Sequence, residues 1–211
     1  MDKETLRKIN NYMLTMTDGF IHDKTHVYRV TNQAISIAKE YSEVNMDVLI
    51  ASCLLHDIGR IIQGKSNKVC HAVEGANRAY DFLKQLGWSE EYCVHVKDCI
   101  ISHRYKTETS PKTIEAKILF DSDKLDMTGA IGISRVLLYK GYMNQPVYGD
   151  DCEDSFLEEY RDRLLKVYDV FYTEQARKIA FERKKLTEIF YEQIIHNEEM
   201  NGTKMIFRSI T

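Results

Sequence analysis

The chain has 211 residues, of which 44% are hydrophobic and 29% are charged, and its formal net charge is −3. This composition is typical of one compact, mostly helical domain. It argues against two classes of partner, because no basic block would attract a nucleic-acid polymer and the best apolar run is interrupted by His56, Asp57 and Arg60 before it could span a membrane.

Apolar residues recur at helical spacing along nearly the whole chain, which predicts an all-α helical bundle. The expected helices of the first half span residues 2–16, 24–42, 47 to about 59, 71–87 and 89–103. The third of these helices would carry Leu54 to Ile58 and end near Gly59. The polar stretch QGKSNK, residues 63–68, is expected to be a loop.

The second half continues the helical pattern. Ser110 followed by Pro111 is a start signal for a helix that runs to Asp123. Further helices are expected over residues 127–140, 153–171 and 174–197, the last of them capped by Thr173. YGDD, residues 148–151, is expected to be a turn, and the final MIFRSIT fits a short strand or an ordered tail.

No repeat or domain linker stands out, so we expect a single domain over residues 1–211. The five cysteines form no CxxC pair, and the N-terminus MDKETLRKIN lacks the apolar stretch of a signal peptide. We therefore expect reduced thiols in a cytoplasmic protein. The tail after Asn201 is a candidate for pairing with another subunit in a homodimer.

Six side chains that can bind metal stand on apolar helix faces or at helix ends: His26, His56, Asp57, His71, His103 and Asp123. A buried carboxylate such as the one in LLHDIGR needs a partner. Neutral imidazoles and carboxylates suit Mn²⁺, Fe²⁺, Zn²⁺, Co²⁺ or Mg²⁺, and these six groups would form a metal site if they converged. A lone buried histidine is more often structural, so the prediction depends on the ordered series H…HD…H…H…D.

This series resembles the HD-domain superfamily of metal-dependent phosphohydrolases, in particular its small bacterial hydrolases. HDKTHVYRV resembles their opening segment, LLHDIGR their name-giving motif, DSDKLDMTGAIGISR the segment with the final aspartate, and TEQARKIAFER their C-terminal helix. The resemblance spans roughly residues 20–195. It implies an HD core over about 20–140 and a C-terminal helical extension over about 150–200.

The resemblance implies that a first metal ion is held by four residues: His26, His56, Asp57 and Asp123. His71 and His103 match two extra ligands of the binuclear branch. In mononuclear members such histidines line the pocket and contact phosphate or the leaving group. Both roles stay open for this pair, as does a purely structural one, so one ion is expected and two are compatible with the sequence.

Two rival residues are set aside by the resemblance. His26 is preferred to His22 because the family's first ligand stands three residues before an arginine, here Arg29. Asp123 is preferred to Asp121 because the last ligand directly precedes a basic residue, here Lys124.

Catalysis would need a group that orients or deprotonates the attacking water, and Asp57 is the expected one, with His71 and His103 beside it. Phosphoryl transfer also needs positive charge. The expected phosphate-binding residues are Arg29, Lys124 and Arg135, and other basic residues near the motifs are Arg60, Lys65, Lys68 and Arg104.

The expected activity is hydrolysis of a phosphoester or pyrophosphate bond in a small phosphorylated metabolite of the nucleotide class. HRYKTETSP contains no GYP motif, which argues against a cyclic dinucleotide. Two alternatives stay open: a di-iron oxygenase of the same superfamily, and a nucleotide-binding regulatory module that keeps the metal as a structural staple.

Overall fold

The computed structural model describes residues 1–17, 24–63, 70–104, 109–148 and 154–201. Every regular element in these ranges is helical, which confirms the predicted all-α class. The chain divides into two compact units. Unit 1 contains Met1–Asp126 and Phe171–Ala176, and unit 2 contains Met127–Val170 and Arg177–Thr211.

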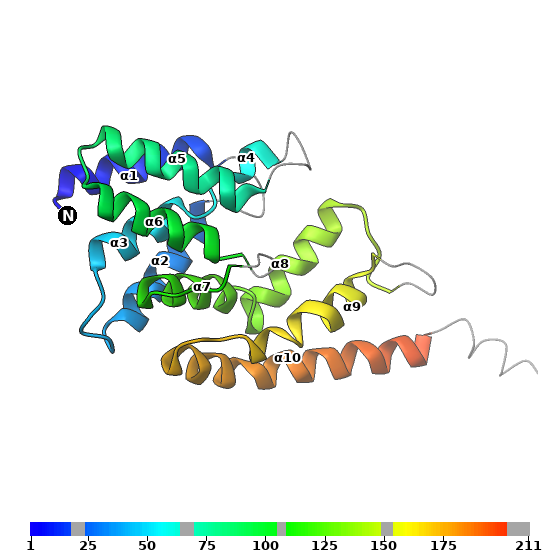
Figure 1. Cartoon of the computed structure of the whole chain (residues 1–211). Helices are drawn as coiled ribbons and strands as arrows, with labels where there is room; N and C mark the ends of the chain where they lie inside the picture. The colour runs from blue at the N-terminus through cyan, green and yellow to red at the C-terminus, as the bar shows by residue number, and fades with distance from the viewer. Residues whose placement is uncertain (18–23, 64–69, 105–108, 149–153, 202–211) are drawn as a thin grey trace, which may run out of the picture. The chain divides into compact units, whose positions relative to one another are not determined.

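Unit 1 is a bundle of seven helices within the described residues. They are α1 (Lys3–Met16), α2 (Lys24–Ala38), α3 (Met46–Leu55), α4 (Arg60–Gln63), α5 (His71–Gln85), α6 (Glu90–Ser102) and α7 (Ile114–Leu125). Helix α2 contacts both α3 and α7, and α5 lies along α6 (Figure 1). The predicted apolar stripe of α2 faces this core, with Val27, Val30 and Ala34 fully buried.

Two helix starts differ from the prediction because other side chains form the caps. The Asn45 side chain accepts hydrogen bonds from the amides of Asp47 and Val48, so α3 begins at Met46. The Thr113 hydroxyl accepts from the Ala116 amide, so α7 begins at Ile114 and Ser110–Pro111 does not start it. Helix α6 begins where expected, and the Ser89 hydroxyl caps it by accepting from the Tyr92 amide.

The predicted helix through Ile58 is also wrong at its end, because α3 stops at Leu55 and residues 56–59 form a turn. Gly59 explains this geometry. A Cβ atom on Gly59 would lie 2.1 Å from the His71 carbonyl oxygen and 2.7 Å from the Gly75 nitrogen. The missing side chain therefore lets the backbone of the turn approach the first turn of α5, which begins at His71.

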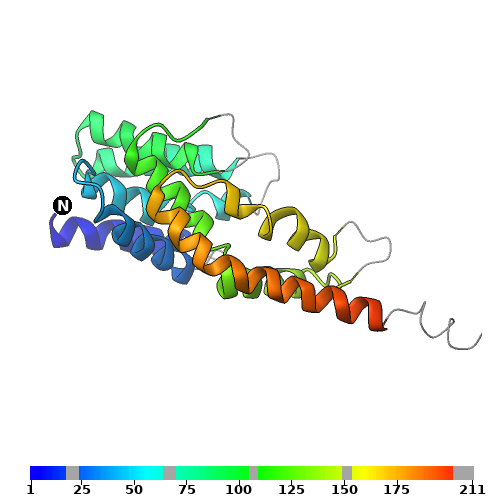
Figure 2. The same ribbon diagram turned by 90° about the horizontal axis from the view of Figure 1, so that it is seen from below.

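Unit 2 contains α8 (Gly129–Tyr142), α9 (Phe156–Glu159), the π-helix η1 (Tyr160–Leu164), the 3₁₀-helix η2 (Val167–Asp169) and most of α10 (Glu174–Asn201). Figure 2 shows α9 and η1 running along α10. Their core is formed by Ile133, Phe156, Tyr160 and Leu164, with Phe190 packed against it.

The continuous helix predicted over residues 153–171 is wrong, because α9, η1 and η2 replace it. Tertiary contacts of Tyr160 take precedence over helical periodicity here. Its side chain is fully buried, its ring stacks on that of Phe190, and its hydroxyl donates to the Thr187 carbonyl at 2.7 Å. Helix α10 starts as predicted after Thr173, whose hydroxyl accepts from the Ala176 amide.

Several predictions fall outside the described residues. These are the QGKSNK loop apart from Gln63, the YGDD turn apart from Tyr148, the form of MIFRSIT, and the placement of His22, Lys65 and Lys68. Among the described residues no helix is both long enough and apolar enough to cross a membrane. The four described cysteines are free thiols, as expected.

Candidate metal centre

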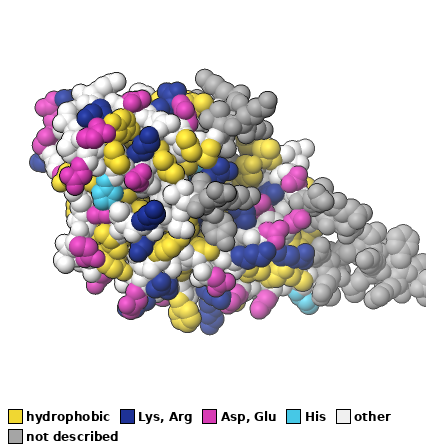
Figure 3. All heavy atoms as spheres, viewed as in Figure 1, with side chains coloured by type: hydrophobic (Ala, Val, Ile, Leu, Met, Phe, Trp, Pro, Cys, Tyr) yellow, Lys and Arg dark blue, Asp and Glu magenta, His cyan; other side chains and the backbone are white. Residues whose placement is uncertain are grey.

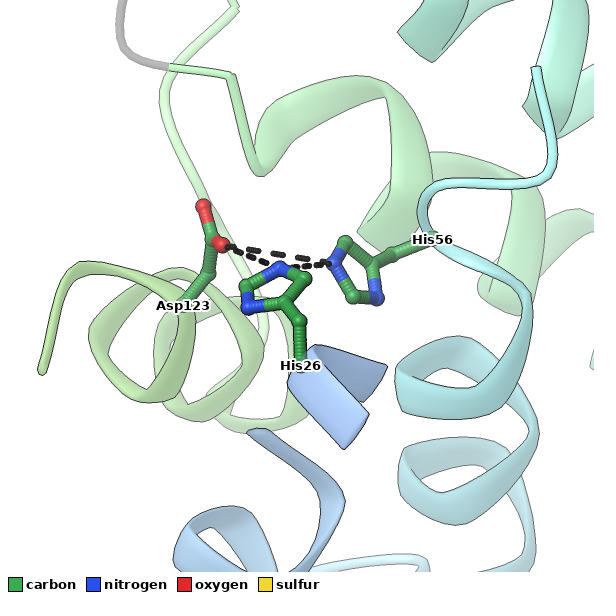
Figure 4. Close-up of side chains that lie close together, drawn as sticks. All are labelled: His26, His56 and Asp123. Atoms are coloured by element: carbon green, nitrogen blue, oxygen red, sulfur yellow. Dashed lines mark hydrogen bonds and ion pairs between the residues drawn. The ribbon is translucent and has the colours of Figure 1, made fainter. Parts of the chain in front are cut away.

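His26, His56 and Asp123 come from three separate parts of unit 1 and point toward one another (Figure 4). His26 lies on α2, His56 directly follows α3, and Asp123 lies on α7. The Nε2 atom of His26 is 3.4 Å from the Nε2 atom of His56 and 3.3 Å from Oδ1 of Asp123. We call these three residues the first triad.

Hydrogen bonds on the far side of each ring decide which nitrogen of the triad's histidines carries the proton. Nδ1 of His56 donates to the Cys53 carbonyl at 2.8 Å, and Nδ1 of His26 donates to Oδ2 of Asp126 at 2.7 Å. A neutral imidazole protonated at Nδ1 has its lone pair on Nε2. In this tautomer the two facing Nε2 atoms both direct a lone pair toward the space between them.

Asp57 adds a fourth acceptor to this cluster. Its Oδ2 atom is 3.7 Å from Nε2 of His26 and 3.7 Å from Nε2 of His56. Ligand atoms that share one ion at about 2.1 Å lie roughly 3 to 3.5 Å apart. The separations in the first triad, 3.3 to 4.0 Å, are close to this spacing. A divalent cation at this position would take these four atoms as its ligands.

The other oxygen of Asp57 faces a second group, which we call the second triad: Asp57, His71 and His103. Oδ1 of Asp57 is 3.8 Å from Nε2 of His71 and 3.7 Å from Nε2 of His103. Nδ1 of His103 donates to the Ile100 carbonyl, so its Nε2 is an acceptor. Both ring nitrogens of His71 are buried and lack a hydrogen-bond partner among the described residues. A buried polar atom in this state needs a partner, and a metal ion or a water molecule could supply it.

Burial keeps two of the histidines, His56 and His71, neutral and able to bind metal. It lowers the pKa of His56 to about 4, against a partly compensating attraction to Asp57. It also lowers the pKa of His71 to about 3, and the Arg60 charge acts in the same direction. Burial alone would raise the pKa of Asp123, but Lys124 and the two nearby histidines hold it well below its ordinary range. Near neutral pH the imidazoles of His56 and His71 are therefore neutral and the carboxylate of Asp123 is ionised.

Charged neighbours form hydrogen bonds with the candidate ligands on the side that faces away from the centre. Lys124 donates to Oδ2 of Asp123 at 2.7 Å, which is the oxygen not facing His26. Arg29 donates to both oxygens of Asp126, at 2.7 and 3.0 Å, and Asp126 in turn holds His26. Asp126 was not predicted from the sequence. Its position three residues after Asp123, on the same face of the helix, was the signal that could have identified it.

The rival residue Asp121 has a structural task instead. It accepts hydrogen bonds from the amides of Tyr172 and Thr173 and from the Thr173 hydroxyl, and it is fully buried. Arg135 lies on α8 in unit 2, and its predicted role with phosphate stays a prediction. Arg104 donates to the Cys70 thiol, directly before His71.

Comparison with known proteins identifies the family. Residues 24–128 match the model of the HD domain family. Over 177 residues the chain is 29% identical to the uncharacterized protein YpgQ of Bacillus subtilis, covering 82% of each chain. It is also 30% identical over 115 residues to the 3'-5' exoribonuclease YhaM of Listeria innocua, covering 48% of this chain but only 37% of that enzyme.

Solved structures share the fold over almost the whole chain. An HD-superfamily hydrolase from Bacillus thuringiensis has a TM-score of 0.72 at 29% identity, covering 95% of this chain and 99% of its own. The crystal structure of B. subtilis YpgQ in complex with ADP has a TM-score of 0.75 at 23% identity, covering 94% and 98%. The six residues of the two triads follow the family's order along the chain, and all of them lie inside the matched range. This chain belongs to the HD-domain superfamily and is similar to its small bacterial hydrolases.

Proposed function

We propose that this protein is a divalent-metal-dependent phosphohydrolase that acts on a small phosphorylated metabolite of the nucleotide class. The observation that carries the proposal is the convergence of four nitrogen and oxygen atoms that can each bind a metal ion: Nε2 of His26, Nε2 of His56, Oδ2 of Asp57 and Oδ1 of Asp123. All four are nitrogen or oxygen atoms, which suit Mn²⁺, Co²⁺, Fe²⁺, Zn²⁺ or Mg²⁺.

The chain's own groups would divide the catalytic work. A bound divalent ion would lower the pKa of a coordinated water and offset charge on a phosphoryl group. Asp57 is 3% exposed and lies between the two triads, so it is the group best placed to orient or deprotonate the attacking water. His71 and His103 face the same carboxylate and would contact either a second ion or the phosphate.

Charge and motif content support a nucleotide rather than a polymer. The net charge is −3, and on the face seen in Figure 3 Lys and Arg side chains are interspersed with Asp and Glu rather than forming a continuous basic groove. The similar protein YpgQ was crystallised with ADP. The missing GYP motif disfavours cyclic dinucleotides. Arg29, Lys124 and Arg135 remain our candidates for phosphate binding, although Arg29 and Lys124 also hold the carboxylates of Asp126 and Asp123.

A metal-by-substrate screen tests the proposal. Chelator-stripped protein is reloaded with each divalent ion and assayed on nucleoside mono-, di- and triphosphates, cyclic dinucleotides and a short RNA, with products resolved by chromatography. We expect Mn²⁺- or Co²⁺-dependent turnover of a nucleotide. Pyrophosphate release would indicate attack at the α-phosphorus, and phosphate release from monophosphates would indicate a nucleotidase. Turnover confined to RNA would refute the small-substrate proposal.

The six nitrogen and oxygen ligand atoms of the two triads also suit a pair of iron ions, which keeps the oxygenase alternative testable. Oxygen consumption by iron-loaded protein, with no hydrolysis of any phosphorylated compound, would favour it. Tight nucleotide and metal binding without any turnover would favour the regulatory module.

A further inference from the structure

The two oxygens of Asp57 have different surroundings. Oδ2 faces His26 and His56 of the first triad. Oδ1 faces His71 and His103, and it also accepts a hydrogen bond from Nε of Arg60 at 2.8 Å. Arg60 is three residues further along the chain, at the start of α4, so the turn at Gly59 places it on this oxygen. The second triad thus already contains a cation.

In the first triad the cation, Lys124, contacts a different carboxylate oxygen from the one that faces the histidines. Lys124 holds Oδ2 of Asp123, whereas the oxygen that faces His26 is Oδ1. The ammonium group therefore supports the carboxylate from behind and leaves its ligand atom available. In the second triad the guanidinium shares the very oxygen that a metal ion would need. The two halves of the centre are unequal for this reason.

The Arg60 charge also opposes a second ion directly. Its guanidinium is hydrogen-bonded to Oδ1 of Asp57, beside the position that the ion would share with His71 and His103. Two cations at such close range repel each other, and the repulsion grows with the charge of the ion. The Arg60 side chain is 32% exposed and can move toward solvent, so the effect weakens the second position without abolishing it.

We propose that Arg60 controls occupation of the second half of the centre: its guanidinium holds the Asp57 oxygen that a second ion requires, so that the two halves fill in sequence with different affinities. The inference rests on the proposed metal centre. It makes Arg60 a positioning residue that acts through Asp57, and it predicts that the enzyme with one ion is the form at low metal concentration.

The test is titration of chelator-stripped protein with Mn²⁺, followed by calorimetry and electron paramagnetic resonance. Wild-type protein should bind one ion tightly and a second at least about tenfold more weakly. Arg60→Gln should tighten the second step about tenfold or more, leave the first nearly unchanged, and show the exchange-coupled signal of two Mn²⁺ ions at lower metal concentration.

Arg78→Gln is the matched control. Arg78 donates through Nε to the Glu74 carboxylate at 2.7 Å on α5, so this variant removes the same charge and the same kind of ion pair away from Asp57. It should behave as wild type. If Arg60→Gln and Arg78→Gln bind the second Mn²⁺ ion with the same affinity, the inference about Arg60 is overturned and the proposed function is not. Absence of any Mn²⁺ binding by folded wild-type protein would instead overturn the proposed function.

A second readout needs no variant. Wild-type crystals at limiting and saturating Mn²⁺ should show Arg60 on Asp57 with one ion bound, and displaced from it with two. Two ions with Arg60 still hydrogen-bonded to Oδ1 of Asp57 would contradict the proposal.

Discussion

Asp57 is the residue on which both triads depend, because each of its oxygens faces a different pair of histidines. Its carboxylate is buried and hydrogen-bonded to Arg60, so it is costly to keep in a protein that does not use it. This is the physical answer to why an aspartate stands among the leucines and isoleucines of LLHDIGR.

Replacing Asp57 should therefore remove metal and activity together. We expect Asp57→Asn to lose most bound Mn²⁺ and to reduce turnover at least about a hundredfold, with helical content retained. Metal analysis, kinetics and circular dichroism provide the three measurements. Asp98→Asn, an exposed aspartate on α6, is the control. A wild-type rate and metal content in Asp57→Asn would rule out the role given to this residue.

Asp126 acts on the metal through His26. Its carboxylate accepts a hydrogen bond from Nδ1, which directs the lone pair of Nε2 toward the position of an ion. Asp126→Ala should weaken Mn²⁺ binding about 10- to 100-fold, the usual effect of losing such a support. Asp126→Asn retains an acceptor and should lose less. Equal calorimetric affinities for wild type and Asp126→Ala would show that His26 is oriented by other contacts.

Burial of His56 makes the stability of the metal-free protein depend on pH. The pKa of His56 is about 4 in the folded chain and about 6.5 when unfolded. Below pH 6.5 the unfolded chain takes up a proton that the folded chain refuses, so stability falls as the pH drops toward 4 and is independent of this residue above 6.5. His56 alone accounts for about 3 kcal/mol of the loss.

Urea unfolding of the metal-free protein, with chelator present and at a series of pH values, would measure this loss. Between pH 6.5 and 4 the free energy of unfolding should fall less steeply with decreasing pH in His56→Gln than in the wild type. Identical slopes for the two proteins would contradict the shifted pKa.

At the scale of elements, the sequence predicted the existence of most helices but not all of their ends. The all-α class and the HD motif series follow from periodicity and order along the chain, both of which are local. The caps formed by Asn45 and Thr113 are also local, but the signal of Thr113 was weaker than that of the competing Ser110–Pro111 pair. The turn at residues 56–59 could not be read from periodicity, because it depends on the approach of α5 to Gly59.

Likewise, the break of the segment after α9 depends on the partners of Tyr160, which come from α10. The candidate ligands were identifiable because the superfamily's ligands occur in a set order. The residues that hold these ligands were not identifiable in the same way. The hydrogen bonds of Arg60 to Asp57 and of His26 to Asp126 depend on the folded structure, and a charged residue near a motif is usually on the surface.

Gly59 offers a test at this scale. A Cβ there would meet backbone atoms of α5 at 2.1 and 2.7 Å, and backbone cannot yield as a flexible side chain can. Gly59→Ala should destabilise the protein by about 2 kcal/mol or more and weaken metal binding, because His71 is displaced.

Gly141→Ala is the matched control, since nothing lies within 4 Å of its added methyl group on α8. Because alanine has a higher helix propensity than glycine, Gly141→Ala should raise the free energy of unfolding by about 0.5 to 1 kcal/mol. Denaturant unfolding compares the two variants. Equal stability of both would mean that the turn at Gly59 is not packed against α5.

At the scale of the whole molecule, the family match covers residues 24–128, and the structural similarity to small HD-superfamily hydrolases extends over nearly all of the chain. Both triads lie in unit 1, within the matched range. A homodimer formed through the tail after Asn201 and a cytoplasmic location stay predictions. What the molecule does depends on whether these six residues hold metal.

Anomalous diffraction from crystals soaked in Mn²⁺ tests that claim most directly. The account predicts a strong anomalous peak bounded by His26, His56, Asp57 and Asp123, and at higher Mn²⁺ a weaker second peak between Asp57, His71 and His103. Well-ordered crystals with Mn²⁺ bound elsewhere and no peak at either triad would contradict it.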